Sequence, residues 1–508
     1  MNAGRSSAEI LAELAALRNL DAPTHGGRVL SYVYDSGLAE LDELARDAAD
    51  LARPLNALDP TTFPSVAAME RDVIAFVRKA LHGATPKLGA GTVIGTVTSG
   101  GTESCLLAVK TARDLWRADN PELAGQLARA GKRPRLVTAA TAHAAFQKAA
   151  RLFDLEWDPV ACGPDGSVRA AGFERKLGAD VALVVVSAPA YPSGALDPIA
   201  SVAQVAKEFG VSCHVDACFG GLVLPWWPGV EPWDFRVPGV TSISADLHKF
   251  GYAPKGVSVL LHRGRRRHRA QFFATTSWPG YPVVNPTLLG SKSASPLAAA
   301  WAITKRLGND GFADLTASCV RSAEVIVREA SQIRGLNVWG APTGPSVALV
   351  TDTDLPDTEQ VDPHHLADEL ATLGFRIQHQ PGFTQPNGVR LPHTAHLTVT
   401  PVTEQTLPEL VAALRAAAES VRGIPRANPR IEYGALQVLG YAPKREGGPY
   451  RLPSPDMAWR MLKIAGAGGK GSSLPGKLAP LMALAERLPA PVAEALLTEL
   501  LARVSEPR

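Results

Sequence analysis

From about residue 92, short runs rich in β-branched residues alternate with longer segments whose apolar residues recur at helical spacing. The runs VIGTV, RLVT and VALVVV are followed by helical segments at 103–117, 144–155 and 199–209. This alternation predicts a mostly parallel sheet with helices on both faces, because parallel strands need long crossover connections. In such sheets, ligands bind at the carboxyl ends of the strands.

The segments before and after this alternation divide the chain further. We expect an N-terminal arm at 1–75, a large domain at 76–334 and a smaller C-terminal α/β domain at 335–422, in which VALVTD and HLTVT are strand candidates. Beyond residue 422 the chain becomes rich in Pro and Gly, as in APKREGGPYRLPSP, which predicts a loop-rich extension at 423–508 that ends in a helix. One role open to this extension is a cover over the active site.

Composition argues against several classes of protein. The chain has 508 residues, of which 20% are charged and 46% hydrophobic, as in ordinary globular proteins, and its net charge of +3 predicts no general attraction to polyanions. The basic run RGRRRHR at 263–269 could bind nucleic acid or an acidic membrane surface. No stacking pattern of aromatic residues accompanies it, so we interpret it as a solvated turn and expect no nucleic-acid partner.

The cysteines and the apolar runs bear on the cellular setting. The five cysteines are scattered and form no C-x-x-C pair, which argues against a disulfide framework or a zinc ribbon and favours a reducing, cytoplasmic setting. Residues 1–19 carry charges throughout and lack the continuous apolar region of a signal peptide. No stretch reaches the roughly 18 apolar residues that span a bilayer, so we expect no membrane span.

The stretch TSGGTES at 98–104 lies between a strand candidate and a helix candidate. Small residues let the backbone approach an anion, and the free N–H groups of a helix N-terminus can hold a phosphate. A turn in which Ser99 or Thr102 caps the helix is an equal alternative. Neither the Walker spacing nor G-x-G-x-x-G is present, which argues against a nucleotide site.

Two further polar residues follow strand candidates. His143 could stack on a flat heteroaromatic ring, although a core or capping histidine is the commoner case. Asp216 ends the apolar run SCHVD, and because an unpaired buried carboxylate is costly, it should have a partner such as a protonated pyridine nitrogen. A structural Asp or a metal site with His214 are the alternatives; no further ligand has suitable spacing, so we expect no metal.

Lys249 lies in GVTSISADLHKFGYAPKGVS, directly after a strand candidate. A lysine that forms a Schiff base with pyridoxal phosphate needs a fixed backbone, partial desolvation that lowers its pKa, and neighbours that hold the phosphate. The alternative is a solvated surface lysine. A Ser-His-Asp hydrolase is disfavoured because the chain has no G-x-S-x-G elbow.

Together, GTVTSGGTES, HVDACFGG and GVTSISADLHKFGYAPKGVS resemble the group II decarboxylase superfamily of fold type I pyridoxal-phosphate enzymes, and within it the sphingosine-1-phosphate lyases. The amino-acid decarboxylases of the superfamily have a different pattern before the lysine. The resemblance covers roughly residues 25–422. It implies a fold type I transferase-like α/β architecture, with a large domain built on a mostly parallel seven-stranded sheet and a smaller C-terminal α/β domain.

The resemblance also assigns the cofactor, pyridoxal 5'-phosphate, to particular residues. Lys249 would carry it as a Schiff base, Asp216 would pair with the ring nitrogen, and His143 would stack on the ring. The residues that would hold the cofactor phosphate are Gly101, Thr102, His248 and Ser291, the last supplied from a neighbouring subunit. A site completed across an interface implies a homodimer.

The implied activity is that of a carbon–carbon (aldehyde) lyase. Lys255 and Tyr34 would face a phosphorylated long-chain base such as sphingosine or dihydrosphingosine 1-phosphate, as in sphingolipid metabolism. Retro-aldol cleavage would give a fatty aldehyde and phosphoethanolamine. The near alternative is an amino-acid decarboxylase. A catalytically idle binding protein without cofactor is disfavoured because Lys249, Asp216 and His143 are all present.

Overall fold

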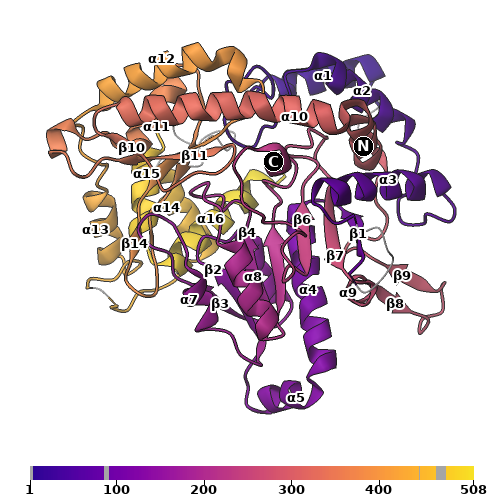
Figure 1. Cartoon of the computed structure of the whole chain (residues 1–508). Coiled ribbons are helices and arrows are strands. Elements are labelled where there is room, and N and C mark those ends of the chain that lie inside the picture. The colour runs from indigo at the N-terminus through magenta and orange to yellow at the C-terminus, as the bar shows by residue number, and fades with distance from the viewer. Residues whose placement is uncertain (1–3, 85–90, 446, 465–475, 508) are drawn as a thin grey trace.

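The computed structural model describes residues 4–84, 91–445, 447–464 and 476–507 (Figure 1). The first helix, α1, begins with a capping box in which Ser6 and Glu9 exchange hydrogen bonds, and none of its residues is buried. The next two helices bury one face each and pack against the long helix α10. The helices of this N-terminal part are α1 (Ser7–Arg18), α2 (Ala39–Leu51) and α3 (Pro64–Ala80).

A seven-stranded sheet forms the centre of the next part of the chain, in the order β1-β7-β6-β5-β4-β2-β3. The strands β2 to β6 run parallel, whereas β7 is antiparallel to both of its neighbours. The prediction of a mostly parallel seven-stranded sheet is therefore confirmed. The strands are β1 (Val93–Thr98), β2 (Arg135–Ala139), β3 (Glu156–Val160), β4 (Val181–Ser187), β5 (Ser212–Asp216), β6 (Ser242–Ala245) and β7 (Ser258–Arg263).

Crossover helices cover this sheet. The strand β4 is buried at every position, because helices lie on both of its sides and both faces of its VALVVV run are apolar. The helices are α4 (Gly101–Asp119), α5 (Pro121–Arg129), α6 (Ala145–Leu152), α7 (Ala170–Glu174) and α8 (Ile199–Glu208), with a 3-10 turn η1 (Leu224–Trp226).

The basic run at 263–269 is not the solvated turn that its charge suggests. Most of it forms the helix α9 (Arg265–Ala270), and two of its guanidinium groups have acceptors inside the protein. Arg263 donates to the carbonyl oxygens of Phe235 and Val240, and Arg267 donates to the Ser212 hydroxyl at 2.8 Å. After α9, the hairpin of β8 (Phe273–Thr275) and β9 (Val283–Asn285) projects from the side of the molecule (Figure 1).

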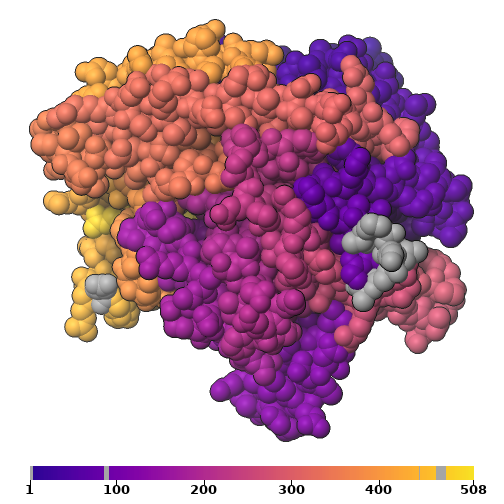
Figure 2. Space-filling model, in the orientation of Figure 1, coloured from indigo at the N-terminus to yellow at the C-terminus, as the bar shows by residue number. Residues whose placement is uncertain are grey.

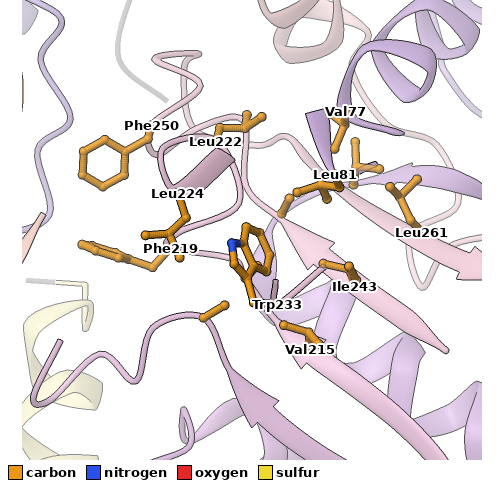
Figure 3. Packing of buried hydrophobic residues seen from close by; sticks show 14 of the residues in the cluster. Val77, Leu81, Val215, Phe219, Leu222, Leu224, Trp233, Ile243, Phe250 and Leu261 are labelled. Atoms are coloured by element: carbon orange, nitrogen blue, oxygen red, sulfur yellow. The ribbon is translucent and has the colours of Figure 1, made fainter. Parts of the chain in front are cut away.

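Trp233 is fully buried and lies at the centre of the main hydrophobic core (Figure 3). Around it are Val77 and Leu81 from the end of α3, and Val215 and Ile243 from the sheet (Figure 3). The N-terminal part of the chain thus contributes to the same core as the sheet. This packing fixes the position of the arm relative to the strand ends.

A second α/β unit follows the long helix α10 (Ser295–Gln332), which is kinked at Gly308 and crosses the top of the molecule (Figures 1 and 2). Its sheet, in the order β10-β11-β15-β12, is antiparallel throughout. The strands are β10 (Leu336–Val338), β11 (Ser346–Thr351), β12 (Gln378–Gln380) and β15 (Thr394–Thr398), and the helices are α11 (Pro363–Thr372) and α12 (Thr403–Val421). Smaller elements are η2 (Asp357–Glu359), β13 (Phe383–Thr384) and β14 (Arg390–Leu391).

The C-terminal part is more helical than its Pro- and Gly-rich sequence suggests. Its helices are α13 (Arg430–Val438), α14 (Pro455–Ile464), α15 (Ala479–Arg487) and α16 (Ala490–Val504). Prolines begin or precede these helices rather than interrupt them, and Leu436, Met461, Leu484 and Val492 form a small core between them. None of the described helices of the chain is long and apolar enough to cross a membrane.

Candidate active site

A cavity of about 620 Å³ opens at the carboxyl ends of the central strands. It is lined by all but one of the residues singled out in the sequence: Tyr34, Gly101, Thr102, His143, Asp216, His248, Lys249 and Lys255. Most of them follow a strand directly. Gly101 comes after β1, His143 after β2 and Lys249 after β6, while Asp216 is the last residue of β5. The described C-terminal residues 423–445, 447–464 and 476–507 do not line this cavity.

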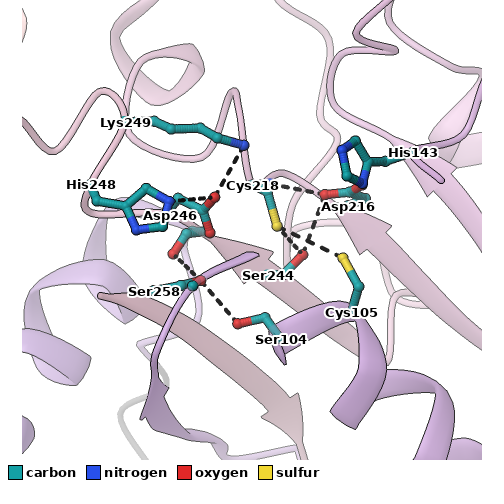
Figure 4. A network of polar contacts seen from close by, with 12 residues as sticks. Ser104, Cys105, His143, Asp216, Cys218, Ser244, Asp246, His248, Lys249 and Ser258 are labelled. Atoms are coloured by element: carbon teal, nitrogen blue, oxygen red, sulfur yellow. Dashed lines mark hydrogen bonds and ion pairs between the residues drawn. The ribbon is translucent and has the colours of Figure 1, made fainter. Parts of the chain in front are cut away.

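Lys249 forms an ion pair with Asp246, with 3.1 Å between Nζ and Oδ2 (Figure 4). The Asp246 side chain is 1% exposed, and His248 Nε2 lies 3.4 Å from the same oxygen. Burial opposes the charge of Asp246, yet Lys249 and His248 outweigh it and hold its pKa below the usual range. Burial would likewise lower the pKa of Lys249, but Asp246 raises it above its ordinary value. The expected lowering of the lysine pKa is therefore wrong, because a buried carboxylate pairs with the amine.

Asp216 lies on the cavity floor in a fixed orientation (Figure 4). Its Oδ1 accepts a hydrogen bond from the Cys218 amide at 3.1 Å and lies 3.5 Å from the Ser244 hydroxyl. Behind it, both ring nitrogens of His214 face serine hydroxyls, at 2.9 and 3.2 Å. Burial lowers the pKa of His214 to about 4, so the ring is neutral at physiological pH.

This geometry also bears on a metal site. His214 uses its ring nitrogens for Ser242 and Ser244, which argues against the alternative of a site built from His214 and Asp216. In the described part of the chain, the one group of possible ligands with atoms within 4.8 Å of one another is Cys105, Asp216 and Cys218. The absence of a functional metal stays a prediction.

The turn before α4 has the shape of an anion cradle. No side chain caps the helix at Gly100, so the capping role considered for Ser99 or Thr102 is wrong. Gly100 has φ +154, and a side chain at Gly101 would meet Asp246 Oδ2 at 2.6 Å. These close approaches need glycine. The amide groups at the start of α4 are therefore left for a ligand.

Lys255 lies at the mouth of the cavity, where its ammonium group is 4.5 Å from the centre of the Tyr34 ring. Its Nζ also donates to the carbonyl oxygen of His248 at 2.8 Å. Partial burial and the neighbouring Lys249 lower the pKa of Lys255 to about 8. Burial raises the pKa of Tyr34 well above its ordinary value, so this phenol stays protonated.

Residues that the sequence did not single out complete the cavity wall. The Tyr191 hydroxyl donates to Gln378 Oε1 at 2.7 Å, and Gln378 Nε2 donates to the Tyr32 hydroxyl at 2.7 Å. Tyr32 has the unusual φ of +61 for a non-glycine residue. Tyr191 follows a strand as the other site residues do, and Asp246 lies three residues before Lys249. Both could therefore have been predicted from the sequence to lie at the site. Gln378, from the smaller sheet, could not.

Ser291 does not line this cavity. Its hydroxyl accepts a hydrogen bond from Asn56 Nδ2 at 3.2 Å, beyond the hairpin of β8 and β9. Its expected role in the site of a second subunit stays a prediction.

The cavity fits pyridoxal phosphate on features of the structure itself. It places a fixed carboxylate (Asp216), a primary amine (Lys249) and a glycine-built cradle at the start of α4 on the walls of one space. The exposed ring of His143 lies on the same wall as Asp216 (Figure 4). These are the groups that would meet a pyridinium nitrogen, an aldehyde, a phosphate and a ring face.

Comparison with known proteins agrees with this arrangement. Residues 42–337 match the family described as "Pyridoxal-dependent decarboxylase conserved domain", and residues 437–503 match "Pyridoxal-dependent enzyme, C-terminal putative HTH domain". The chain is 32% identical to a sphingosine-1-phosphate lyase of Dictyostelium discoideum over 77% of its own length and 69% of that protein.

Two solved structures extend the comparison. A sphingosine-1-phosphate lyase of Burkholderia pseudomallei is 32% identical, with a TM-score of 0.74 over 86% of this chain and 95% of that one. A glutamate decarboxylase of Lactobacillus brevis has a TM-score of 0.72 over 83% of this chain and 94% of that one. Its identity is only 21%, so it shows the shared fold alone.

Proposed function

The chain belongs to the pyridoxal-dependent decarboxylase family, and on that premise we propose that it is a carbon–carbon lyase of the sphingosine-1-phosphate lyase type. Its cofactor is pyridoxal 5'-phosphate. Its substrate is a phosphorylated long-chain base such as dihydrosphingosine 1-phosphate, and the products are a fatty aldehyde and phosphoethanolamine.

One observation carries the proposal: a single cavity is lined by the buried Asp216, the partly buried Lys249 and a second, more exposed cation, Lys255. A substrate amine can then lie near Lys249 while its phosphate meets Lys255. Tyr34, which contacts Lys255, and Phe219 line the cavity and form an edge-to-face contact, with ring centroids 6.3 Å apart. Phe250 supports both rings from behind, so this wall has an apolar character suited to an alkyl chain.

The residues that would hold the cofactor are those of the floor and the cradle. Asp216 would pair with the ring nitrogen, His143 would stack on the ring, and Lys249 would bind the aldehyde covalently. Gly101, Thr102 and His248 would hold the phosphate. When bound, the cofactor supplies an electron sink that stabilises negative charge at the substrate carbon next to the amine. Ser244 and the Cys218 amide keep the Asp216 carboxylate oriented for this role.

The chain's own groups account for substrate binding and proton transfer. Lys255 binds the substrate phosphate as a point charge. Burial raises the pKa of Tyr34 above its ordinary value, so this phenol stays protonated and donates a hydrogen bond to a substrate oxygen. Burial raises the pKa of Tyr191 to about 12; this phenol donates its hydrogen bond to Gln378, so its oxygen accepts a hydrogen bond from the substrate. Lys249 Nζ lies in the same cavity as the substrate and, in its uncharged form, takes the proton of the substrate C3 hydroxyl.

A homodimer with shared sites is part of the proposal. Ser291 lies outside the cavity of its own chain, in the segment that follows the projecting hairpin of β8 and β9. Large apolar side chains are exposed on this hairpin and the segment after it: Phe273, Trp278, Tyr281, Val284, Leu288 and Leu289. A second copy would cover them and bring the partner's Ser291 to the cofactor phosphate.

A reducing, cytoplasmic setting is also proposed. All five cysteines are free and buried, including Cys105 and Cys218, whose sulfur atoms are 3.9 Å apart without a bond. The expectation that nucleic acid is not a partner remains a prediction.

The test compares products. Purified enzyme loaded with pyridoxal phosphate is incubated in parallel with dihydrosphingosine 1-phosphate and with a panel of amino acids. We expect a long-chain aldehyde from the first reaction and no carbon dioxide from the second. Release of carbon dioxide without aldehyde would contradict the lyase proposal and support the amino-acid decarboxylase. Failure of the protein to bind pyridoxal phosphate would contradict both activities.

A further inference from the structure

A second cavity, of about 370 Å³, lies where the two-stranded sheet of β13 and β14 meets the C-terminal helices, and none of its lining residues lines the cavity of Lys249. One wall comes from β14 and the others from α15 and the segment that leads into α13, elements that lie side by side in Figure 1. Four arginines line it: Arg390, Arg426, Arg430 and Arg487.

The carboxylate that faces these arginines is Glu486, whose side chain is 2% exposed. Its Oε2 accepts from Arg390 at 2.5 Å and from Arg426 at 2.6 Å. The other oxygen, Oε1, is buried and has no hydrogen-bond partner among the described residues. Glu486 is thus a fixed anchor that holds two guanidinium groups at the cavity wall.

The other two arginines have no carboxylate within ion-pair distance in the described part of the chain. Arg487 donates to Asn428 Oδ1 at 2.9 Å and stacks over the Tyr433 ring at 4.7 Å. These contacts orient the guanidinium group without neutralising it. Four guanidinium groups therefore surround one carboxylate, which leaves a strong excess of positive charge in a concave site.

We propose that this cavity binds a small phosphate-bearing anion. Guanidinium groups match the oxygens of a phosphate with paired, charge-assisted hydrogen bonds. Arg390 and Arg426 are already ordered by Glu486, and Arg487 by Asn428 and Tyr433, so little side-chain freedom is lost on binding. A bound phosphate bridges β14 to α13 and α15, and so ties the C-terminal helices to the two-stranded sheet of β13 and β14. The site is independent of the reaction proposed above.

Calorimetric titration of the holoenzyme with inorganic phosphate and with phosphoethanolamine tests the site. We expect saturable binding with a Kd of ~1 mM or below. In Arg430→Gln/Arg487→Gln the Kd should rise by about ten-fold or more. This double variant removes the two arginines without acidic partners and leaves the buried Glu486 pairs intact. Tighter binding of phosphoethanolamine identifies an organic phosphate as the ligand, whereas equal binding identifies the free anion; both support the site.

Two controls separate this site from the catalytic cavity. Arg460→Gln removes an exposed charge from the neighbouring helix α14 outside the cavity, and binding should stay within about two-fold of the wild type. Lys255→Gln should weaken phosphate binding at the catalytic cavity and leave phosphate binding at the arginine-lined cavity unchanged. Phosphate binding that is lost in Lys255→Gln and unchanged in Arg430→Gln/Arg487→Gln overturns the proposal, as does the absence of saturable binding. Equal melting temperatures establish that the variants are folded, and Arg430→Gln alone serves if the double variant is not.

Discussion

Lys255 is a cavity residue whose pKa lies near physiological pH, because burial and Lys249 lower it to about 8. The ammonium form is present below that pH and is lost above it. If Lys255 binds the substrate phosphate, kcat/KM should fall as the pH rises through about 8, since this ratio reports the free enzyme. A pH profile from 6 to 10 measures this directly, at about half-unit steps.

The matched variant is Lys255→Arg. A guanidinium group keeps its charge over this whole range, so the fall near pH 8 should disappear even if the rate is lower. An unchanged fall in Lys255→Arg would assign it to another group.

Gln378 is expected to position Tyr191 rather than to touch the reacting atoms. Its side-chain oxygen accepts a hydrogen bond from the Tyr191 hydroxyl, and its side-chain nitrogen donates one to the Tyr32 hydroxyl. Gln378→Ala leaves the Tyr191 hydroxyl without this acceptor, and we expect kcat to fall by about ten-fold, less than the loss of a catalytic acid or base. Tyr32→Phe removes only the outer hydrogen bond and should have a smaller effect. Steady-state kinetics of both variants test this order, and equal effects would contradict it.

The individual site residues differ in how far the sequence could predict them. Lys249, Asp216 and His143 follow β-rich runs, and the strand ends of a parallel sheet meet at one edge, so their convergence followed from local pattern. Gln378 reaches the cavity only because the antiparallel second sheet packs against the first, which no local pattern reports. The raised pKa of Lys249 likewise depends on the buried position of Asp246.

Among the elements, α15 is attached to the smaller domain in part by a buried side chain on α11. Asp368 accepts hydrogen bonds from the amides of Leu478 and Ala479 at 2.8 and 3.0 Å, and from His379 at 2.9 Å. It therefore caps α15 from a distant part of the chain.

Asp368→Ala should loosen the C-terminal helices selectively. Loss of this cap and of the His379 hydrogen bond should destabilise them by about 1–2 kcal/mol. Hydrogen exchange should become faster in α15 and α16 while the central sheet is unchanged. Glu369→Ala, the neighbouring position on α11, is the control. Faster exchange throughout the chain would contradict a local attachment.

The helices of the C-terminal part show where sequence patterns fail. α13, α14 and α15 are short and separated by Pro- and Gly-rich connections, so no long apolar period stands out. Their apolar side chains form a small core of their own, between helices that are not adjacent in the sequence. In the two α/β units, by contrast, longer periodic segments predict the type of each element correctly. The prediction for the basic run that contains α9 is wrong because the acceptors of its guanidinium groups lie on other elements.

At the scale of the whole molecule, a shared site predicts complementation between subunits. Lys249→Ala retains Ser291, and Ser291→Ala retains Lys249. In a mixed dimer, the site with an intact Lys249 would receive the partner's Ser291 and be fully wild type. Co-refolded or co-expressed mixtures should therefore be more active per intact Lys249 than Ser291→Ala alone. No gain in the mixture would place Ser291 outside the site or exclude the dimer.

The central claim is that one cavity cleaves the carbon–carbon bond of a phosphorylated long-chain base. The most direct measurement is the stoichiometry of both products from dihydrosphingosine 1-phosphate, by mass spectrometry, for the wild type and for Lys249→Ala after incubation with pyridoxal phosphate. We expect equal amounts of long-chain aldehyde and phosphoethanolamine from the wild type and neither from Lys249→Ala. Unequal products, or equal activity in the variant, would contradict it.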